Sequence, residues 1–286
     1  MITRILIVAL YIAACLRLRA KPWLYFQLNA EHFNKAKGIF SKLDIDQLIP
    51  ARWRLDQFRD SGSEQPTHYP VFIKPEWGQN SAGIVRADNL EQLQEHRKGR
   101  DLSAMPFLVQ ESATENCEFE IYVIRDEENE HQFSLMSITE TVNHSDDEFP
   151  INGIYNNNTS YRDLNDLISD ETRQKIWSHI KQINNFRVAR FGMRANSIEE
   201  VATGKFHIIE INLFLPMPLY LETAGLTSTD KLRFLLKNAH LLAKVTRSIP
   251  KYHKSKSVFF RKLYVHRTTS QSSRTESVDR QKGVAL

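Results

Sequence analysis

Apolar and polar positions alternate along the chain in a pattern that predicts short strands separated by a few helices. Apolar runs predict strands at 71–73, 84–86, 107–110, 119–125, 133–139, 188–193 and 206–211. Helices are predicted at 5–15, after Asp88, at 169–185 and at 230–245. A further strand is predicted at 23–28 (WLYFQL), a helix at 32–43, and a long polar loop between 193 and 206. Because charged turns such as 126–131 (DEENEH) join successive strands, we expect an α+β fold with largely antiparallel sheets.

The apolar run at 5–15 (ILIVALYIAAC) has two interpretations. It resembles the core of a short signal peptide, but Arg17, Arg19 and Lys21 follow it in place of a clean cleavage site. Its 11 residues are too few to cross a bilayer as a helix, which takes about 20. We therefore expect either a buried helix or an interfacial helix with a basic flank.

Composition indicates a globular protein of a reducing compartment. The chain has 286 residues, 41% hydrophobic and 25% charged, enough for one large domain or two small, interlocked ones. Its two cysteines, Cys15 and Cys117, lie far apart and lack the spacing of a zinc site or a redox pair. The expected location is cytoplasmic, with peripheral attachment at the inner membrane surface as an alternative.

Basic residues are concentrated at the C-terminal end. Residues 250–286 contain nine Lys and Arg against two acidic residues, so this segment carries +7 and the rest of the chain −3 of the total +4. The segment is Ser-rich and aperiodic toward its end, which predicts disorder. Contact with a membrane surface stays open, whereas nucleic-acid binding is not expected because most such tails are solvated ends.

A lysine at the end of an apolar strand precedes a loop bounded by glycines. Lys74 directly follows the apolar run 71–73, and the loop from Gly78 to Gly83 contains Gln79 and Ser81. A strand-borne ammonium group can meet phosphate oxygens while backbone N–H groups of such a loop close over them. Taken alone, a lysine at a strand end is more often a surface charge, so the segment needs support from the rest of the chain.

Carboxylates and one amide at or near strand ends supply that support. Glu111 ends a predicted strand, next to Gln110, and Glu118 begins the following strand. Such carboxylates suit hydrogen bonds to an adenine edge and to ribose hydroxyls, although exposed turns are the commoner place for glutamate. Glu210 and Asn212 lie two apart in an apolar strand and therefore share one face. Their oxygens suit Mg²⁺, or alternatively Mn²⁺, bridging phosphates.

In this order the residues resemble the ATP-grasp superfamily, and within it the branch similar to D-alanine–D-alanine ligases. The resemblance covers about 23–249 and implies two mixed α/β lobes that enclose a nucleotide cleft. It implies that Lys74 and the 78–83 loop contact the phosphates, and that Gln110 and Glu111 lie near adenine. It further implies that Glu118 binds ribose and that Glu210 and Asn212 bind magnesium. Residues 26–42 (FQLNAEHFNKAKGIFSK) also look like the start of a less characterised ATP-grasp group with an amphipathic N-terminus, which implies a second phosphate-facing lysine, Lys42.

The chain departs from the family pattern at a position that bears on catalysis. Where the family has Arg-x-Asp, this chain has Arg190, Phe191 and Gly192. The resemblance implies that Arg190 stabilises the transferring phosphate or a tetrahedral oxyanion. Gly192 leaves the metal with one carboxylate fewer, and residues 156–158 (NNN) replace the Gly-Asp-Gly turn of related ligases.

These patterns predict an ATP- and Mg-binding carboxylate–amine ligase that acts on small, amino-acid-like substrates through an acylphosphate. Lys74 and Arg190 are the expected catalytic residues. The predicted divisions are an N-terminal helix (1–21), a leading segment (22–65), the ATP-grasp domain (66–249) and the basic tail (250–286). Two alternatives remain: a nucleotide-binding protein with little or no turnover, favoured by Gly192, and a peripheral membrane or nucleic-acid-associated protein, favoured by the tail.

Overall fold

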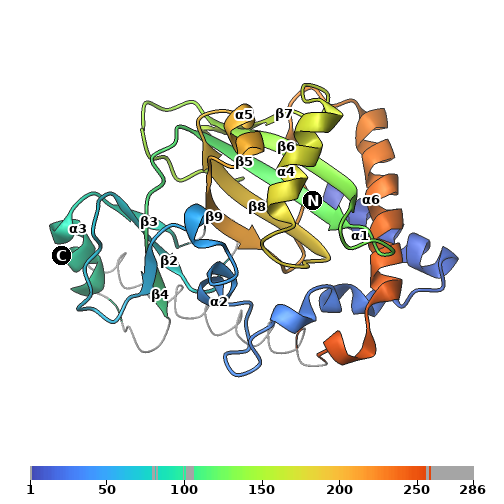
Figure 1. Cartoon of the computed structure of the whole chain (residues 1–286), viewed down its shortest axis with the longest axis horizontal. Helices are drawn as coiled ribbons and strands as arrows, with labels where there is room; N and C mark the ends of the chain where they lie inside the picture. The colour runs from blue at the N-terminus through green and yellow to red at the C-terminus, as the bar shows by residue number, and fades with distance from the viewer. Residues whose placement is uncertain are drawn as a thin grey trace, which may run out of the picture.

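Two antiparallel sheets make up the framework of the molecule (Figure 1). The computed structural model describes residues 2–78, 81, 83–98, 100, 106–255 and 258. Within this part of the chain the smaller sheet has the strand order β1-β4-β2-β3, and the larger sheet has the order β7-β6-β5-β8-β9. The predicted α+β class with largely antiparallel sheets is confirmed.

Most strands of the structure lie where the apolar runs of the sequence predict them. The smaller sheet contains β1 (Gln57–Arg59), β2 (Val71–Pro75), β3 (Val85–Ala87) and β4 (Phe107–Glu111). The larger sheet contains β5 (Cys117–Arg125), β6 (Phe133–Asn143), β7 (Thr159–Asp163), β8 (Val188–Ala195) and β9 (His207–Asn212). The α-helices are α1 (Ile2–Arg17), α2 (Lys42–Asp46), α3 (Leu90–Lys98), α4 (Asp170–Ile180), α5 (Ile198–Thr203) and α6 (Ser228–Ser248). Short 3-10 helices are η1 (Pro22–Gln27), η2 (Ala30–His32), η3 (Ala51–Trp53), η4 (Leu219–Glu222) and η5 (Lys251–His253).

Two predictions in the N-terminal segment are wrong. Residues 23–28 form most of η1 in place of a strand, because Pro22 at its first position presets a helical φ. The predicted helix over 32–43 is largely irregular, and α2 begins only at Lys42. Ser41 sets that start, since its hydroxyl accepts a hydrogen bond from the backbone N–H of Asp44 at 3.2 Å.

The predicted loop between β8 and β9 contains a helix, α5. Its two ends carry recognisable signals: the Ser197 side chain accepts from the backbone N–H of Glu200, and Gly204 ends the helix in the left-handed conformation (φ 83°). A Cβ at Gly204 would in addition lie 3.1 Å from the His179 ring. Strands β1 and β7 were also not predicted from the sequence.

The larger sheet separates two apolar clusters. On one face, Phe119 and Ile121 of β5 pack with Trp177 of α4 and with α5. On the other face, Tyr122 and Ile124 pack with α1 and α6, which lie on that side in Figure 1. Since side chains alternate along a strand, Glu118 and Glu120 also lie on this second face, beyond the part that α1 and α6 cover.

The smaller sheet also has one packed face and one open face. Val71, Ile73 and Val109 pack against Leu93 of α3. Because side chains alternate along β2, Lys74 points to the opposite face. That face is directed toward the larger sheet and forms half of the site described below.

Helix α1 is buried on one side only. Tyr11 and Cys15 pack against α6, and the Tyr11 hydroxyl is 3.0 Å from Thr246 Oγ1. The opposite side exposes apolar residues at helical spacing, namely Ile5, Val8, Ile12 and Leu16. The expected buried helix is thus confirmed for one side of α1, and the interfacial alternative stays a prediction. Among the described helices, none is long and apolar enough to cross a membrane.

The beginning of the basic segment packs on the body of the molecule. Residues 251–253 form η5, and the backbone N–H of Ser255 donates to Gln27 Oε1 at 2.6 Å. Val258 is fully buried in the core. The disorder predicted for the rest of the tail concerns residues that lie outside the described ones.

Asn29 connects the N-terminal segment to the larger sheet, and its loss should be costly. Its side chain is buried and donates to the carbonyls of Val188 at 2.6 Å and Leu213 at 2.9 Å. It also accepts from the backbone N–H of Arg187 at 3.0 Å. We expect Asn29→Ala to lower the free energy of unfolding by about 2–4 kcal/mol, because three buried backbone groups lose their partner.

Urea denaturation followed by circular dichroism measures this change. Asn185→Ala is the matched control, because Asn185 is exposed and its side chain donates to Glu130 at the surface. Its effect should stay within about 0.5 kcal/mol. Equal stability of the two variants would contradict the anchoring role of Asn29.

Candidate functional site

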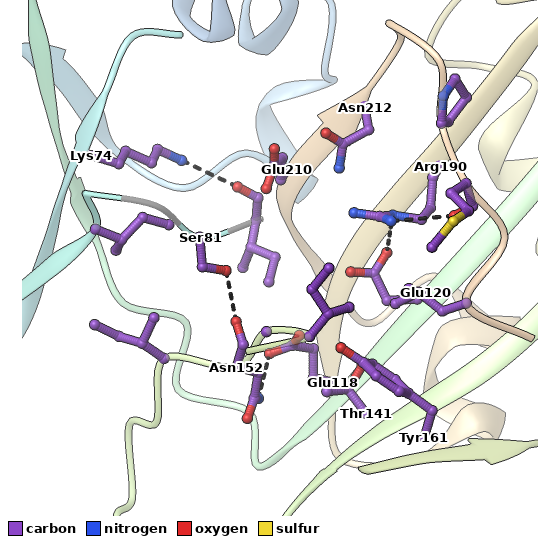
Figure 2. Close-up of a pocket in the computed structure, with 18 of the residues that line it drawn as sticks. Lys74, Ser81, Glu118, Glu120, Thr141, Asn152, Tyr161, Arg190, Glu210 and Asn212 are labelled. Atoms are coloured by element: carbon purple, nitrogen blue, oxygen red, sulfur yellow. Dashed lines mark hydrogen bonds and ion pairs between the residues drawn. The ribbon is translucent and has the colours of Figure 1, made fainter. Parts of the chain in front are cut away.

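A cavity of about 430 Å³ lies between the two sheets. Figure 2 shows side chains from both sheets pointing into it. The smaller sheet contributes Phe72, Lys74, Gln110 and Glu111, and the larger sheet contributes Glu118, Glu120, Thr141, Tyr161, Arg190, Arg194, Ile209, Glu210 and Asn212. The strand-borne lysine and the acid–amide pair singled out in the sequence therefore converge on one space.

Lys74 reaches across the cavity toward the larger sheet (Figure 2). Its ammonium group donates to Gln110 Oε1 at 2.7 Å and to the carbonyl oxygen of Ile209 at 3.3 Å. Burial, and next the neighbouring charge of Lys42, lower the pKa of Lys74 to about 7, although Glu210 opposes this shift. An anion in the cavity would raise that pKa and stabilise the ammonium form.

Lys42 is held beside the same space by the end of β2. Its backbone N–H donates to the carbonyl of Glu76 at 3.1 Å. The buried Glu76 carboxylate accepts from Lys37 Nζ at 2.6 Å and from the Ser41 hydroxyl, and so fixes the segment before α2. As a result Lys42 Nζ lies 3.6 Å from Glu210 Oε1. The second lysine that the resemblance implied is therefore placed next to the acid–amide pair.

A β-bulge in β9 shapes the centre of the site. Glu210 pairs with Gly192, but Ile208 pairs with Met193, so Ile209 is an extra residue in β9. Its carbonyl is the one that accepts from Lys74. The bulge thereby gives a buried ammonium group a backbone acceptor.

The acid–amide pair lies on one face, as period two requires. Burial would raise the pKa of Glu210, but the charges of Lys42 and Lys74 lower it below its ordinary value. The Asn212 amide, with its nitrogen toward Glu210, donates to Glu210 Oε1 at 3.0 Å and accepts from Arg190 at 3.0 Å. Glu210 is thus held as an ionised carboxylate.

Arg190 is fixed from three sides. Its Nε is 3.1 Å from Glu120 Oε2, one terminal nitrogen donates to Asn212, and the other donates to the carbonyl of Met217 at 3.2 Å. The guanidinium plane is therefore oriented before any ligand binds. Burial, opposed by Arg190, raises the pKa of Glu120 to about 7, and the charge of Glu118 adds to the increase.

Glu120 is a site residue that the sequence analysis missed. The signal was present, because the segment 117–125 places Glu118 and Glu120 two apart in one strand and hence on one face. Glu120 also lies beside the position where the family pattern has an aspartate. Its Oε1 would be 3.5 Å from a Cβ at Gly192, and Ile209 Cγ1 would be 3.2 Å from it.

Glu118 lies on the far side of Glu120 and connects the sheet to the loop at 149–154. Arg194 is 3.3 Å from Glu118 Oε2, and Asn152 Nδ2 donates to the same oxygen at 2.9 Å. The Ser81 hydroxyl in turn donates to the Asn152 carbonyl at 2.7 Å. The predicted glycine-bounded loop therefore contacts the cavity through Ser81 (Figure 2).

Some residues predicted to bind nucleotide either contact other parts of the protein or do not border the cavity. Glu111 borders the cavity, but its Oε1 accepts from the backbone N–H groups of Thr67 and His68, at 2.8 and 3.1 Å. That carboxylate oxygen therefore serves to fix a loop. Gly78 and Gly83, although described, are not among the residues that border the cavity, and Gln79 lies outside the described part of the chain.

The donor set fits a cation that also binds phosphate. Among the described residues, no group of three or more His, Cys, Asp and Glu side chains is arranged to hold a metal ion by itself. Glu210 and Asn212 nevertheless offer hard oxygen donors, which suit Mg²⁺ or Mn²⁺, next to Lys42 and Lys74.

Comparisons with known proteins give similar solved structures. No family model and no curated protein sequence matches the chain. D-alanine–D-alanine ligase from Bacillus anthracis, complexed with ATP, is 12% identical at a TM-score of 0.45, over 71% of this chain and 67% of that one. VanG D-Ala:D-Ser ligase from Enterococcus faecalis is 17% identical at 0.46, over 73% and 70%.

The ATP-grasp ligase PsnB, complexed with minimal precursor, is 18% identical at a TM-score of 0.43, over 70% of this chain and 59% of that one. With scores below 0.5 the likeness is partial and assigns neither ligand nor activity. The resemblance to the ATP-grasp superfamily therefore rests on the sequence motifs.

Proposed function

We propose that the cavity binds ATP and that the protein uses it to join a carboxylate to an amine. The observation that carries this proposal is the convergence of Lys74 from one sheet with Glu210 and Arg190 from the other. Two cations and an oxygen donor around one space are the groups that a triphosphate with a divalent ion requires.

The buried lysine supports the phosphate assignment. The hydrogen-bond acceptors of Lys74 are a neutral amide and a backbone carbonyl, both weaker partners than a phosphate oxygen. Phe72 and Ile84 border the cavity on the side of the smaller sheet and offer apolar surface to a nucleobase. Glu210 and Asn212 would hold Mg²⁺ or Mn²⁺, which supplies charge neutralisation on the transferring phosphate.

The reaction consists of two substitutions. An oxygen of the substrate carboxylate attacks the terminal phosphorus, and the bond from that phosphorus to the ADP oxygen breaks. The amine nitrogen then attacks the acyl carbon, phosphate leaves with the bonding electrons, and the amine loses one proton. Lys42 and Lys74 bind phosphate oxygens, and Arg190 donates to the developing oxyanion. Glu120, whose pKa is about 7 and which holds Arg190, is placed to receive the proton.

Nucleotide binding without turnover is the first alternative, and Gly192 is the feature that favours it. Titration with ATP, with and without Mg²⁺, combined with an assay of ADP release over amino-acid and short-peptide acceptors, separates the two functions. Mg²⁺-dependent binding together with acceptor-dependent ADP release supports the ligase. Tight binding with no release for any acceptor would replace it with the alternative.

Attachment to a membrane surface is a second candidate, and α1 is the feature that favours it. Its exposed apolar face is followed by three exposed basic residues, Arg17, Arg19 and Lys21. This combination suits a helix that lies in the interface of an anionic bilayer. The candidate is compatible with the ligase, because Ile5, Ile12 and Leu16 of this face do not border the cavity.

Lys74→Ala should weaken ATP binding roughly ten- to a hundredfold, because a charge-assisted hydrogen bond to phosphate is lost. Glu210→Gln should mainly remove the part of the affinity that depends on Mg²⁺. Calorimetric titration measures both effects, with melting temperature as the check on folding. Lys175→Ala is the control, since Lys175 forms an exposed pair with Glu171. If both site variants bind ATP with wild-type affinity, Lys74 and Glu210 are not part of the ATP site.

ATP affinity should fall as the pH rises above about 7. The free protein loses the Lys74 proton near that pH, whereas the bound phosphate requires the ammonium form. Binding at pH 8 should therefore take up a proton, and the affinity should fall by up to about tenfold per pH unit. Titration in buffers of different ionisation enthalpy measures the uptake. In Lys74→Ala the uptake should disappear; its persistence there would assign it to another group.

The double variant Ile12→Asp, Leu16→Asp should reduce binding to vesicles that contain anionic lipid. Cosedimentation with neutral and with anionic vesicles measures the effect. Leu167→Asp is the control, since Leu167 is 72% exposed and lies in the loop before α4. Equal vesicle binding of all three proteins, or association of copies in place of vesicle binding, would exclude α1 as a membrane contact.

A further inference from the structure

One end of the cavity has no part in the chemistry described so far. We call it the helical end, and its residues are Ile7, Val8, Tyr25, Met217, Leu219 and Asn238. They come from α1, η1, α6 and the segment that follows β9. By contrast, the charged side chains among the described lining residues all belong to strands β2, β4, β5, β8 and β9. The cavity therefore has a charged end and an uncharged end.

The helical end begins at Arg190. The guanidinium of Arg190 donates to the carbonyl of Met217, so the two groups are in direct contact. Tyr122 is the strand partner of Arg190, and its hydroxyl donates to Asn238 Oδ1 at 2.9 Å. A ligand group bound at Arg190 can therefore extend along the sheet toward α6 without leaving the cavity.

The walls of the helical end are apolar and supported from behind. Tyr25 packs against Tyr11 of α1, with ring centroids 4.8 Å apart. Ile7 and Val8 contribute aliphatic surface from the same helix. The chemistry thus favours an aliphatic or aromatic group in this space, because water would find few partners there.

We propose that the helical end binds the apolar tail of the carboxylate substrate, while the carboxylate itself lies at Arg190. This inference rests on the proposed ligase function and names the substrate class. None of the six residues of the helical end carries a charge, so this end favours an uncharged tail over an ammonium group. A carboxylate with a tail of several carbons therefore fits it.

The tail could be the side chain of an aliphatic amino acid or an unbranched acyl chain, and one titration distinguishes them. The full-length protein is titrated calorimetrically, without nucleotide, with acetate, butanoate, hexanoate and octanoate, and with alanine and leucine. We expect the affinity to rise roughly three- to fourfold per added methylene until the helical end is full. A leucine that binds more tightly than hexanoate assigns an amino acid, and the reverse order assigns an acyl chain.

Three variants test whether the tail lies in the cavity. Ile7→Trp fills the helical end, because Ile7 borders the cavity and is half-buried, and it should lower the affinity for octanoate at least tenfold while the affinity for acetate is unchanged. Ile12→Trp introduces the same bulk at an exposed residue of α1 that does not border the cavity, and it should keep the wild-type length dependence. Ile7→Ala enlarges the helical end and should shift the preference to longer chains, so the test holds even if Ile7→Trp does not fold.

The outcomes separate this inference from the proposed function. Carboxylates that bind with no dependence on length, or equal length profiles for Ile7→Trp and Ile12→Trp, overturn the inference. If ATP binds in a separate titration, the proposed function survives that failure. Length-dependent carboxylate binding in a protein that does not bind ATP would instead retain the helical end and reject the ligase.

Discussion

The buried ammonium group of Lys74 is the interaction on which the arrangement of the site depends. Taking a cation out of water costs several kcal/mol unless it gains hydrogen bonds or an opposite charge. Its acceptors within the described chain, Gln110 Oε1 and the carbonyl of Ile209, are neutral. Burial, together with the charge of Lys42, lowers the pKa of Lys74 to about 7. Folding therefore already includes the cost of burying the ammonium group. An anion that binds in the cavity relieves that cost, which adds to the binding free energy.

On the larger sheet, charged and polar side chains hold one another in fixed orientations. Glu120 holds Arg190, Arg190 holds the Asn212 amide, and that amide holds Glu210. These contacts run across three adjacent strands, because residues paired in an antiparallel sheet point to the same face. Each group is oriented by its neighbours, so the charged side chains of the cavity are in place before any ligand binds.

Strands could be predicted where apolar residues are dense, as in β5 and β8, and α6 followed from its regular apolar spacing. The site residues on one strand could be predicted in the same way, because period two places Glu210 and Asn212 together. Glu111 shows the limit, since the Thr67 and His68 backbone that its carboxylate binds belongs to a loop 43 or more residues away. The cavity-facing side of α1 could not be predicted either, because residues 5–16 are apolar on all sides and only packing on α6 distinguishes them.

Gly192 links the departure from the family pattern to the shape of the site. A side chain at this position would contact Ile209 at the bulge and the Glu120 carboxylate, both of which lie within 3.5 Å of its Cβ position. The bulge gives Lys74 its carbonyl acceptor, and Glu120 orients Arg190. A Cβ at 192 would require the Ile209 side chain to shift by a few tenths of an ångström and would be in ordinary contact with Glu120 Oε1, and an aspartate would add a second carboxylate beside Glu120. Gly192 therefore leaves room both for Ile209 at the bulge and for Glu120, which supplies the carboxylate beside Arg190 from β5.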